Sequence, residues 1–122
     1  MMPNELLVQT IVFYSFYFLG GFILLLFPPK INKWYGMRTK KSLKNSENWN
    51  IAQANSAKYI MFFSLVLFLI SLSVKFASGA IVNALALYVL IDILLIIIAT
   101  FVTYFLVEQK IIFFSSKNKD IF

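Results

Sequence analysis

Three long apolar stretches, separated by shorter polar segments, run along the chain. They predict helices over residues 6–27, 46–76 and 81–107. At ~1.5 Å per residue, each helix is long enough to cross the ~30 Å hydrocarbon core of a bilayer. Pro28 ends the first helix, because proline cannot donate a helical hydrogen bond. The predicted fold class is therefore all-α: a single integral membrane domain over residues 1–122, with three transmembrane helices and a short helical segment in its longest loop.

Charged side chains are sparse within these stretches and are compatible with membrane insertion. Lys58 and Lys75 flank the uncharged part of the second helix, and we expect them to extend their ammonium groups toward opposite interfaces. Asp92 opposes insertion of the third helix by about 2.5–3.5 kcal/mol, whereas each of its many aliphatic residues favours insertion by ~0.3–0.6 kcal/mol. The third helix is also longer than the hydrocarbon core, so we expect it to tilt or to project beyond the membrane.

The composition supports a membrane protein and excludes most other classes. Of the 122 residues, 61% are hydrophobic and only 13% are charged, against roughly 25% in soluble domains. So small a domain could not bury this much apolar surface in water. This excludes a water-soluble monomer, a disordered chain, a coiled coil and nucleic-acid binding through general basicity. The chain contains no cysteine and no histidine, which excludes thiolate or imidazole catalysis and Cys/His zinc sites. We expect a non-enzyme without cofactor or metal.

The net charge of +6 is distributed unevenly. The loop between the first two helices is strongly basic, the connection between the second and third holds only Lys75, and the segment before the first helix holds no basic residue. The positive-inside rule therefore predicts a cytoplasmic loop and C-terminal tail, with the N-terminus and the turn at residues 77–80 outside. The basic residues concerned are Lys30, Lys33, Arg38, Lys40, Lys41, Lys44 and Lys58 in the loop and Lys110, Lys117 and Lys119 in the tail.

The basic loop has features of a juxtamembrane hairpin. Aromatic side chains expected at headgroup depth are Trp34, Tyr35 and Trp49. Gly36 permits a turn with positive φ, and Thr39 is expected to cap a short helical turn that contains or ends at Ser42. Asn45 or Ser46 is expected to cap the second helix. From the residues alone, the loop is interpreted as a hairpin that docks on anionic membrane lipids.

The order of residues in this loop resembles the SdpI family of small bacterial membrane proteins. The pattern is N-x-x-Y-G-x-R-T-x-x-S, followed by a tryptophan and an asparagine, between a first membrane helix and two further ones. Its residues here are Asn32, Tyr35, Gly36, Arg38, Thr39, Ser42, Trp49 and Asn55. Many relatives have a small residue shortly after the last position, where this chain has Lys58 and Tyr59, so a close helix contact is not expected there.

The resemblance implies a function. The family's namesake is an immunity protein of the cell membrane of Gram-positive bacteria, which protects the producing cell from its own membrane-disrupting toxin peptide. It also signals by holding a cytoplasmic repressor at the membrane. The leading hypothesis is therefore immunity and signalling, with a toxin peptide and a repressor as partners. Alternatives are a small non-catalytic subunit or regulator of a larger membrane complex, and an oligomeric pore or transporter fragment.

Small and polar residues recur on one face of each predicted helix, and we expect the three faces to meet, since lipid offers no hydrogen bonds. An acid within the span is a candidate functional group that should face the bundle interior. Three interpretations of Asp92 stay open: a structural interhelical hydrogen bond, with either protonation state of the acid, recognition of a toxin or ligand within the bilayer, and proton coupling. The three faces contain Thr10, Tyr14, Tyr17 and Gly21; Ala57, Ser64, Ser71 and Lys75; and Ala84, Tyr88, Asp92, Ala99 and Thr103.

Two further groups allow a functional and a structural interpretation. The Arg38 guanidinium suits a carboxylate or phosphate and could dock a partner or a lipid headgroup. Equally, Arg38 could bond helix-end carbonyls while Thr39 and Ser42 act as caps. Ser71 and Lys75 lie four residues apart, but we expect Lys75 to be an outer-interface anchor rather than part of a catalytic dyad.

Overall fold

The computed structural model describes residues 3–32, 35–77 and 84–119, and the described part is all-helical. Three helices in it are long and apolar enough to cross a membrane, as predicted. The loop between the first two contains the expected short helical segment, a single 3₁₀ turn. The elements are α1 (Asn4–Leu26), η1 (Ser42–Lys44), α2 (Ser46–Ala77) and α3 (Leu85–Lys119).

The helix bounds agree with the prediction except at the end of α3. That helix continues to Lys119 rather than ending near Val107, so the predicted C-terminal tail is largely helical. Residues 108–119 contain no proline or glycine, and nothing in them ends a helix that has already formed. The prediction was wrong because it placed the end of the helix at the end of the apolar stretch. The predicted start at residue 81 and most of the turn at residues 77–80 lie outside the described residues.

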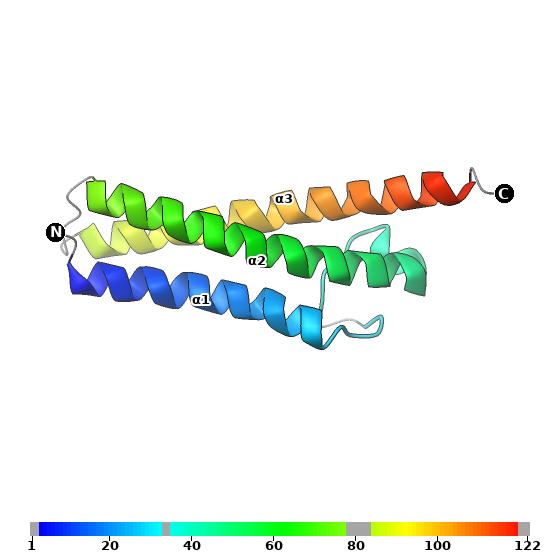
Figure 1. Ribbon diagram of the computed structural model, residues 1–122, viewed down its shortest axis with the longest axis horizontal. Coiled ribbons are helices and arrows are strands. Elements are labelled where there is room, and N and C mark those ends of the chain that lie inside the picture. The colour runs from blue at the N-terminus through cyan, green and yellow to red at the C-terminus, as the bar shows by residue number, and fades with distance from the viewer. Residues whose placement is uncertain (1–2, 33–34, 78–83, 120–122) are drawn as a thin grey trace.

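The three long helices form an elongated bundle in which α1 and α3 run in one direction and α2 runs in the other (Figure 1). The start of α1 and the end of α2 lie at one end of the bundle. The loop of residues 28–45, called the hairpin below, lies at the opposite end, and the last turns of α3 project beyond it (Figure 1). The middle helix, α2, packs against both of the others, whereas α1 and α3 have fewer contacts with each other.

The interior of the bundle is more polar than its surface. Large apolar side chains such as Phe16, Leu69 and Phe101 are exposed, as expected where lipid is the solvent. The predicted meeting of the three polar faces is confirmed, although Tyr17, Ala84 and Tyr88 are only partly buried. The buried members of those faces are Thr10, Tyr14, Gly21, Ala57, Ser64, Ser71, Lys75, Asp92, Ala99 and Thr103.

A close contact between α1 and α2 forms at Gly21, where none was expected from the residues of α2. A Cβ added at Gly21 would lie 2.9 Å from Cγ2 of Ile60 and 3.0 Å from the carbonyl oxygen of Ala57. Small residues allow membrane helices to approach in this way. The two helices therefore approach closely because Gly21 on α1 has no side chain, although α2 has Lys58 and Tyr59 where a small residue would otherwise allow the approach.

Candidate functional site: an ionic network between the helices and a fixed hairpin

The centre of the polar interior is an ion pair between α2 and α3. The Lys75 ammonium lies 2.5 Å from Oδ2 of Asp92, and both side chains are buried. The prediction that Lys75 is an outer-interface anchor is therefore wrong, whereas the inward orientation predicted for Asp92 is confirmed. The physical reason is the buried Asp92 carboxylate on the neighbouring helix, because an ionisable side chain inside a membrane protein pairs with an opposite charge.

The Asp92 carboxylate accepts hydrogen bonds from all three helices. On Oδ1 the donors are the Tyr14 hydroxyl of α1, at 2.9 Å, and the Ser71 hydroxyl of α2, at 2.7 Å. On Oδ2 they are Lys75 and the side-chain amide of Gln9 on α1, at 2.8 Å. Each oxygen thus receives two donors, which satisfies a carboxylate without any contribution from water.

The Lys75 ammonium is satisfied in the same network. It donates to Oγ1 of Thr10 at 2.7 Å and to Oε1 of Gln9 at 3.1 Å. It also lies 5.8 Å from the centre of the Tyr88 ring, within the range of a cation–π interaction. Among the described residues, no buried side-chain nitrogen or oxygen lacks a hydrogen-bond partner. The network is therefore closed, and it connects the three helices.

Of the predicted intramembrane residues, the structure brings together Asp92, Ser71 and Tyr88. The other two bond within their own helices: the Ser64 hydroxyl donates to the carbonyl oxygen of Met61, and that of Thr103 to the carbonyl oxygen of Ala99. Gln9 is a member of the network that the sequence analysis missed. The residue type did indicate an inward orientation, because a side-chain amide that faced lipid would have no hydrogen-bond partner.

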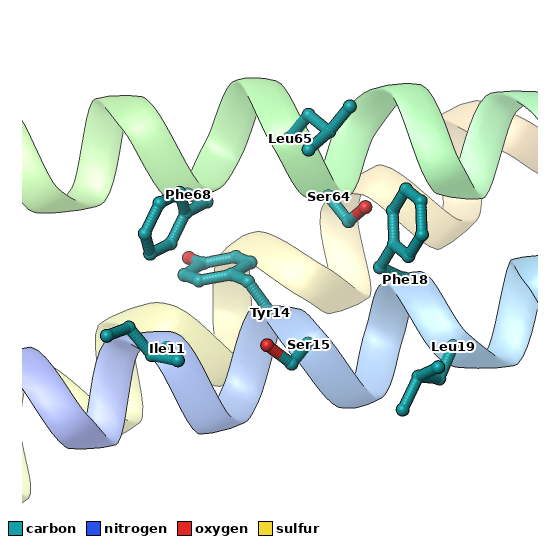
Figure 2. A pocket seen from close by; sticks show the side chains of 8 residues that line it. All are labelled: Ile11, Tyr14, Ser15, Phe18, Leu19, Ser64, Leu65 and Phe68. Carbon is teal, nitrogen blue, oxygen red and sulfur yellow. The ribbon is translucent and has the colours of Figure 1, made fainter.

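A largely apolar groove of about 450 Å³ opens between α1 and α2 beside this network. Figure 2 shows the Tyr14 ring within it, between the rings of Phe18 and Phe68, with the Ser64 hydroxyl close by. The centres of the Tyr14 and Phe68 rings are 6.4 Å apart in an edge-on arrangement. Tyr14 therefore belongs to both features, because its ring lines the groove and its hydroxyl bonds Asp92.

The hairpin is held to α2 by one side chain that the sequence interpretation missed. Gln53, fully buried, accepts from the backbone N–H of Met37 at 2.7 Å and donates to the carbonyl oxygen of the same residue at 2.8 Å. Gly36 precedes this contact with a φ of 103°, which L-residues rarely adopt, so the predicted turn is confirmed. A Cβ at Gly36 would lie 2.5 Å from the Gln53 side-chain oxygen.

Thr39 and Ser42 cap each other, which confirms the structural interpretation of this pair. The N–H of Thr39 donates to the Ser42 hydroxyl at 2.8 Å, and the N–H of Ser42 donates to the Thr39 hydroxyl at 3.0 Å. Lys41 then links the hairpin to α3, because its N–H donates to the Glu108 carboxylate at 3.2 Å. Its carbonyl oxygen accepts from the side chain of Asn48 on α2, at 3.0 Å.

Trp49 lies in the first turn of α2, where the prediction placed it, and its side chain is buried within the protein. Its indole N–H donates to the carbonyl oxygen of Pro29 at 2.7 Å, which joins the start of α2 to the end of α1. A buried indole needs such an acceptor, and the backbone that leaves α1 supplies one. Asn45 caps α2 as predicted, with its side chain accepting from the N–H of Asn48 at 2.8 Å. The predicted anchor Trp34 lies outside the described residues.

The remaining motif residues divide between local structure and surface. The Asn32 side chain accepts from the N–H of Tyr35 at 2.7 Å, and the Asn55 amide donates to the carbonyl oxygen of Ile51 at 2.8 Å. Tyr35 and Arg38 are exposed on the hairpin. The motif therefore builds a rigid loop that presents an aromatic and a cationic side chain at one end of the bundle.

Comparison with known proteins agrees with this architecture. The family model of the SdpI/YfhL protein family matches residues 29–105, which include the hairpin, α2 and most of α3. The chain is also 31% identical over 94 residues to the uncharacterized protein YfhL of Bacillus subtilis, and the match covers 76% of each chain. No solved structure matches.

Proposed function

This chain belongs to the SdpI/YfhL protein family, and from that premise we propose that it is a bacterial membrane immunity and signalling protein. It protects its cell against a membrane-active toxin peptide, as the family's namesake does. In this proposal the hairpin and the last turns of α3 face the cytoplasm, because the lysines and Arg38 gather at that end. The protein acts by binding, without catalysis, cofactor or direct contact with nucleic acid.

The observation that supports a peptide-binding role is the dual position of Tyr14. A peptide helix that enters the bilayer exposes apolar side chains, and the groove between α1 and α2 offers it an apolar, aromatic surface. A ligand in the groove would contact the Tyr14 ring, whose hydroxyl is bonded to the buried ionic network. Binding at the surface is thereby coupled to the contacts that hold the three helices together.

The hairpin is the proposed signalling surface. Gln53 and Glu108 fix its backbone against α2 and α3, the Thr39–Ser42 pair fixes it internally, and Arg38 is exposed. A cytoplasmic repressor with an acidic surface could bind this cationic loop, since a guanidinium pairs well with carboxylates. A change in the packing of α2 and α3 would alter the hairpin, because the hairpin has contacts with both helices.

Protection can be tested in a toxin-sensitive bacterial host challenged with candidate peptides. We expect Leu65→Trp, which places an indole in the groove, to reduce protection at unchanged protein level. The matched control is Leu69→Trp, one turn along α2 on the exposed surface and not part of the groove, which should protect like the wild type. Equal protection by both variants would contradict the groove as the binding surface. A stoichiometric membrane-protein partner that co-purifies without toxin would favour the subunit hypothesis instead.

The signalling part is tested separately with Arg38→Ala. We expect this variant to retain protection but to lose membrane retention of a repressor, followed as the membrane-bound fraction of a fluorescent repressor fusion. Lys30→Ala, which removes an exposed charge elsewhere on the hairpin, is the control. Retention that is equal in the wild type and the Arg38 variant would contradict the proposed role of Arg38.

A further inference from the structure

We propose that a hollow beside η1 binds the phosphate of an anionic phospholipid headgroup. The hollow has a volume of about 560 Å³ and lies between the hairpin, the first turn of α2 and the last turns of α3. One wall includes Lys41 and Lys44 of the hairpin, and the opposite wall includes Ile111, Ile112, Ser115 and Ser116 of α3. This site is independent of toxin binding and of the groove between α1 and α2.

The cationic wall is available for an anion. Among the described residues, neither the Lys41 nor the Lys44 ammonium forms an ion pair. The backbone of Lys41 is fixed on both sides, by Glu108 on α3 and Asn48 on α2, so its side chain starts from a defined position. The first turn of α2 adjoins the same space, and its dipole adds positive potential.

The opposite wall supplies hydroxyl donors and an apolar surface. Ser115 and Ser116 are exposed side chains on α3, one turn after Ile111 and Ile112. A phosphate could accept from the serine hydroxyls while the lysines neutralise its charge. A free phosphate or a nucleotide phosphate has no apolar group that could pack against the apolar wall. The glycerol and first methylene groups of a lipid can pack there.

The position of the hollow along α3 favours a lipid over a soluble ligand. The uncharged stretch that follows Asp92 in α3 ends at Glu108, and the hollow begins one turn beyond that residue. In that turn Ile112 and Phe113 are exposed, which is typical of a segment at the membrane interface. The phosphate groups of the adjacent leaflet lie at this depth, so the ligand would enter from the bilayer itself.

The test is native mass spectrometry of the full chain released from phosphatidylcholine nanodiscs that contain phosphatidylglycerol. We expect preferential retention of phosphatidylglycerol, with the apparent affinity reduced about tenfold to thirtyfold in Lys41→Gln/Lys44→Gln. The matched control, Lys30→Gln/Lys110→Gln, removes two exposed charges near the same end of the bundle but outside the hollow, and it should retain the lipid. Circular dichroism establishes that each variant is folded.

A second pair of variants leaves both lysines in place. Ser115→Glu introduces an acid into the hollow and should abolish preferential retention, whereas Asn50→Glu adds the same charge to an exposed position of α2 and should not. An equal loss in test and control variants would show general attraction to anionic lipid and would overturn the site. No loss in either test variant would overturn it as well. Displacement of the lipid by glycerol 3-phosphate at equal concentration would overturn the assignment to a lipid.

Discussion

Lys75 in the last turns of α2 and Asp92 in the third turn of α3 form an ion pair with 3% and 0% of their side chains exposed. Neither residue is bonded only to the other. Gln9 on α1 bonds both partners, and two more side chains of α1 join them, since Tyr14 donates to Asp92 and Thr10 accepts from Lys75. The two charges compensate each other, which allows both to lie inside a membrane protein at a tolerable cost. The pair is therefore the main polar link among the three helices.

Breaking the pair on one side should destabilise the bundle strongly. In Lys75→Met the Asp92 carboxylate loses its counter-charge while it stays buried, and we expect a loss of about 3–5 kcal/mol in the free energy of unfolding. Unfolding by sodium dodecyl sulfate, followed by circular dichroism, measures this value. The double variant Lys75→Met/Asp92→Leu should recover part of the loss, because no uncompensated charge stays buried although Gln9, Tyr14 and Ser71 lose their acceptor. A double variant as unstable as the single one would contradict this explanation.

Two tyrosine hydroxyls on α1 should differ in their contribution to stability. Tyr14→Phe removes a bond to an ionised carboxylate and should lower the free energy of unfolding by about 1–2 kcal/mol. Tyr17→Phe removes a neutral contact, 3.1 Å from the Thr100 hydroxyl, and should cost less than about 0.6 kcal/mol. The same detergent titration compares the two. Equal costs would mean that the network contributes no more than an ordinary interhelical hydrogen bond.

Most of the fold follows from the apolar pattern. The spacing and length of the apolar stretches were sufficient to predict three helices. The stripes of small and polar residues were sufficient to orient the helices, because in lipid a polar face can form hydrogen bonds only with the polar face of another helix. The end of α3 could not be found in this way. Beyond Val107 charged and polar residues interrupt the apolar pattern while the sequence remains compatible with a helix, and hydropathy reports only where the continuous apolar stretch ends.

The site was less predictable than the fold. Asp92, Ser71 and Lys75 could be placed on the right faces, but the ion pair of Lys75 with Asp92 depends on which residue of a neighbouring helix lies beside it. Gln53 was missed for the same reason, since its partner is the backbone of Met37, which is sixteen residues away. A side chain that bonds to the backbone does not require a particular residue type in its partner, so the sequence contains no pattern that would reveal the contact. The burial of Trp49 within the protein could not be predicted, because an aromatic residue at a helix end fits both the interface and the core.

Replacement of Gly36 should loosen the hairpin without disturbing the bundle. Gly36→Ala places a Cβ 2.5 Å from the Gln53 oxygen and forces an L-residue into a left-handed conformation that costs about 1–2 kcal/mol. We expect faster trypsin cleavage after Arg38, measured by mass spectrometry of timed samples. Gly20→Ala is the control, because a Cβ there meets nothing within 4 Å and alanine favours a helix. Equal cleavage rates in the two variants would contradict the proposed role of Gly36.

The direction of the chain across the membrane can be determined with single cysteines, since the protein has none of its own. The proposed orientation places Glu5 outside and both Leu43 and Ser116 inside, and all three are exposed positions. In intact protoplasts, a membrane-impermeant maleimide should label Glu5→Cys only, whereas permeabilised cells should show all three labelled. Leu43 and Ser116 must behave alike, because an even number of crossings separates the hairpin from the last turns of α3 (Figure 1). Labelling of Leu43→Cys in intact protoplasts would place the hairpin outside and remove the basis for a cytoplasmic partner.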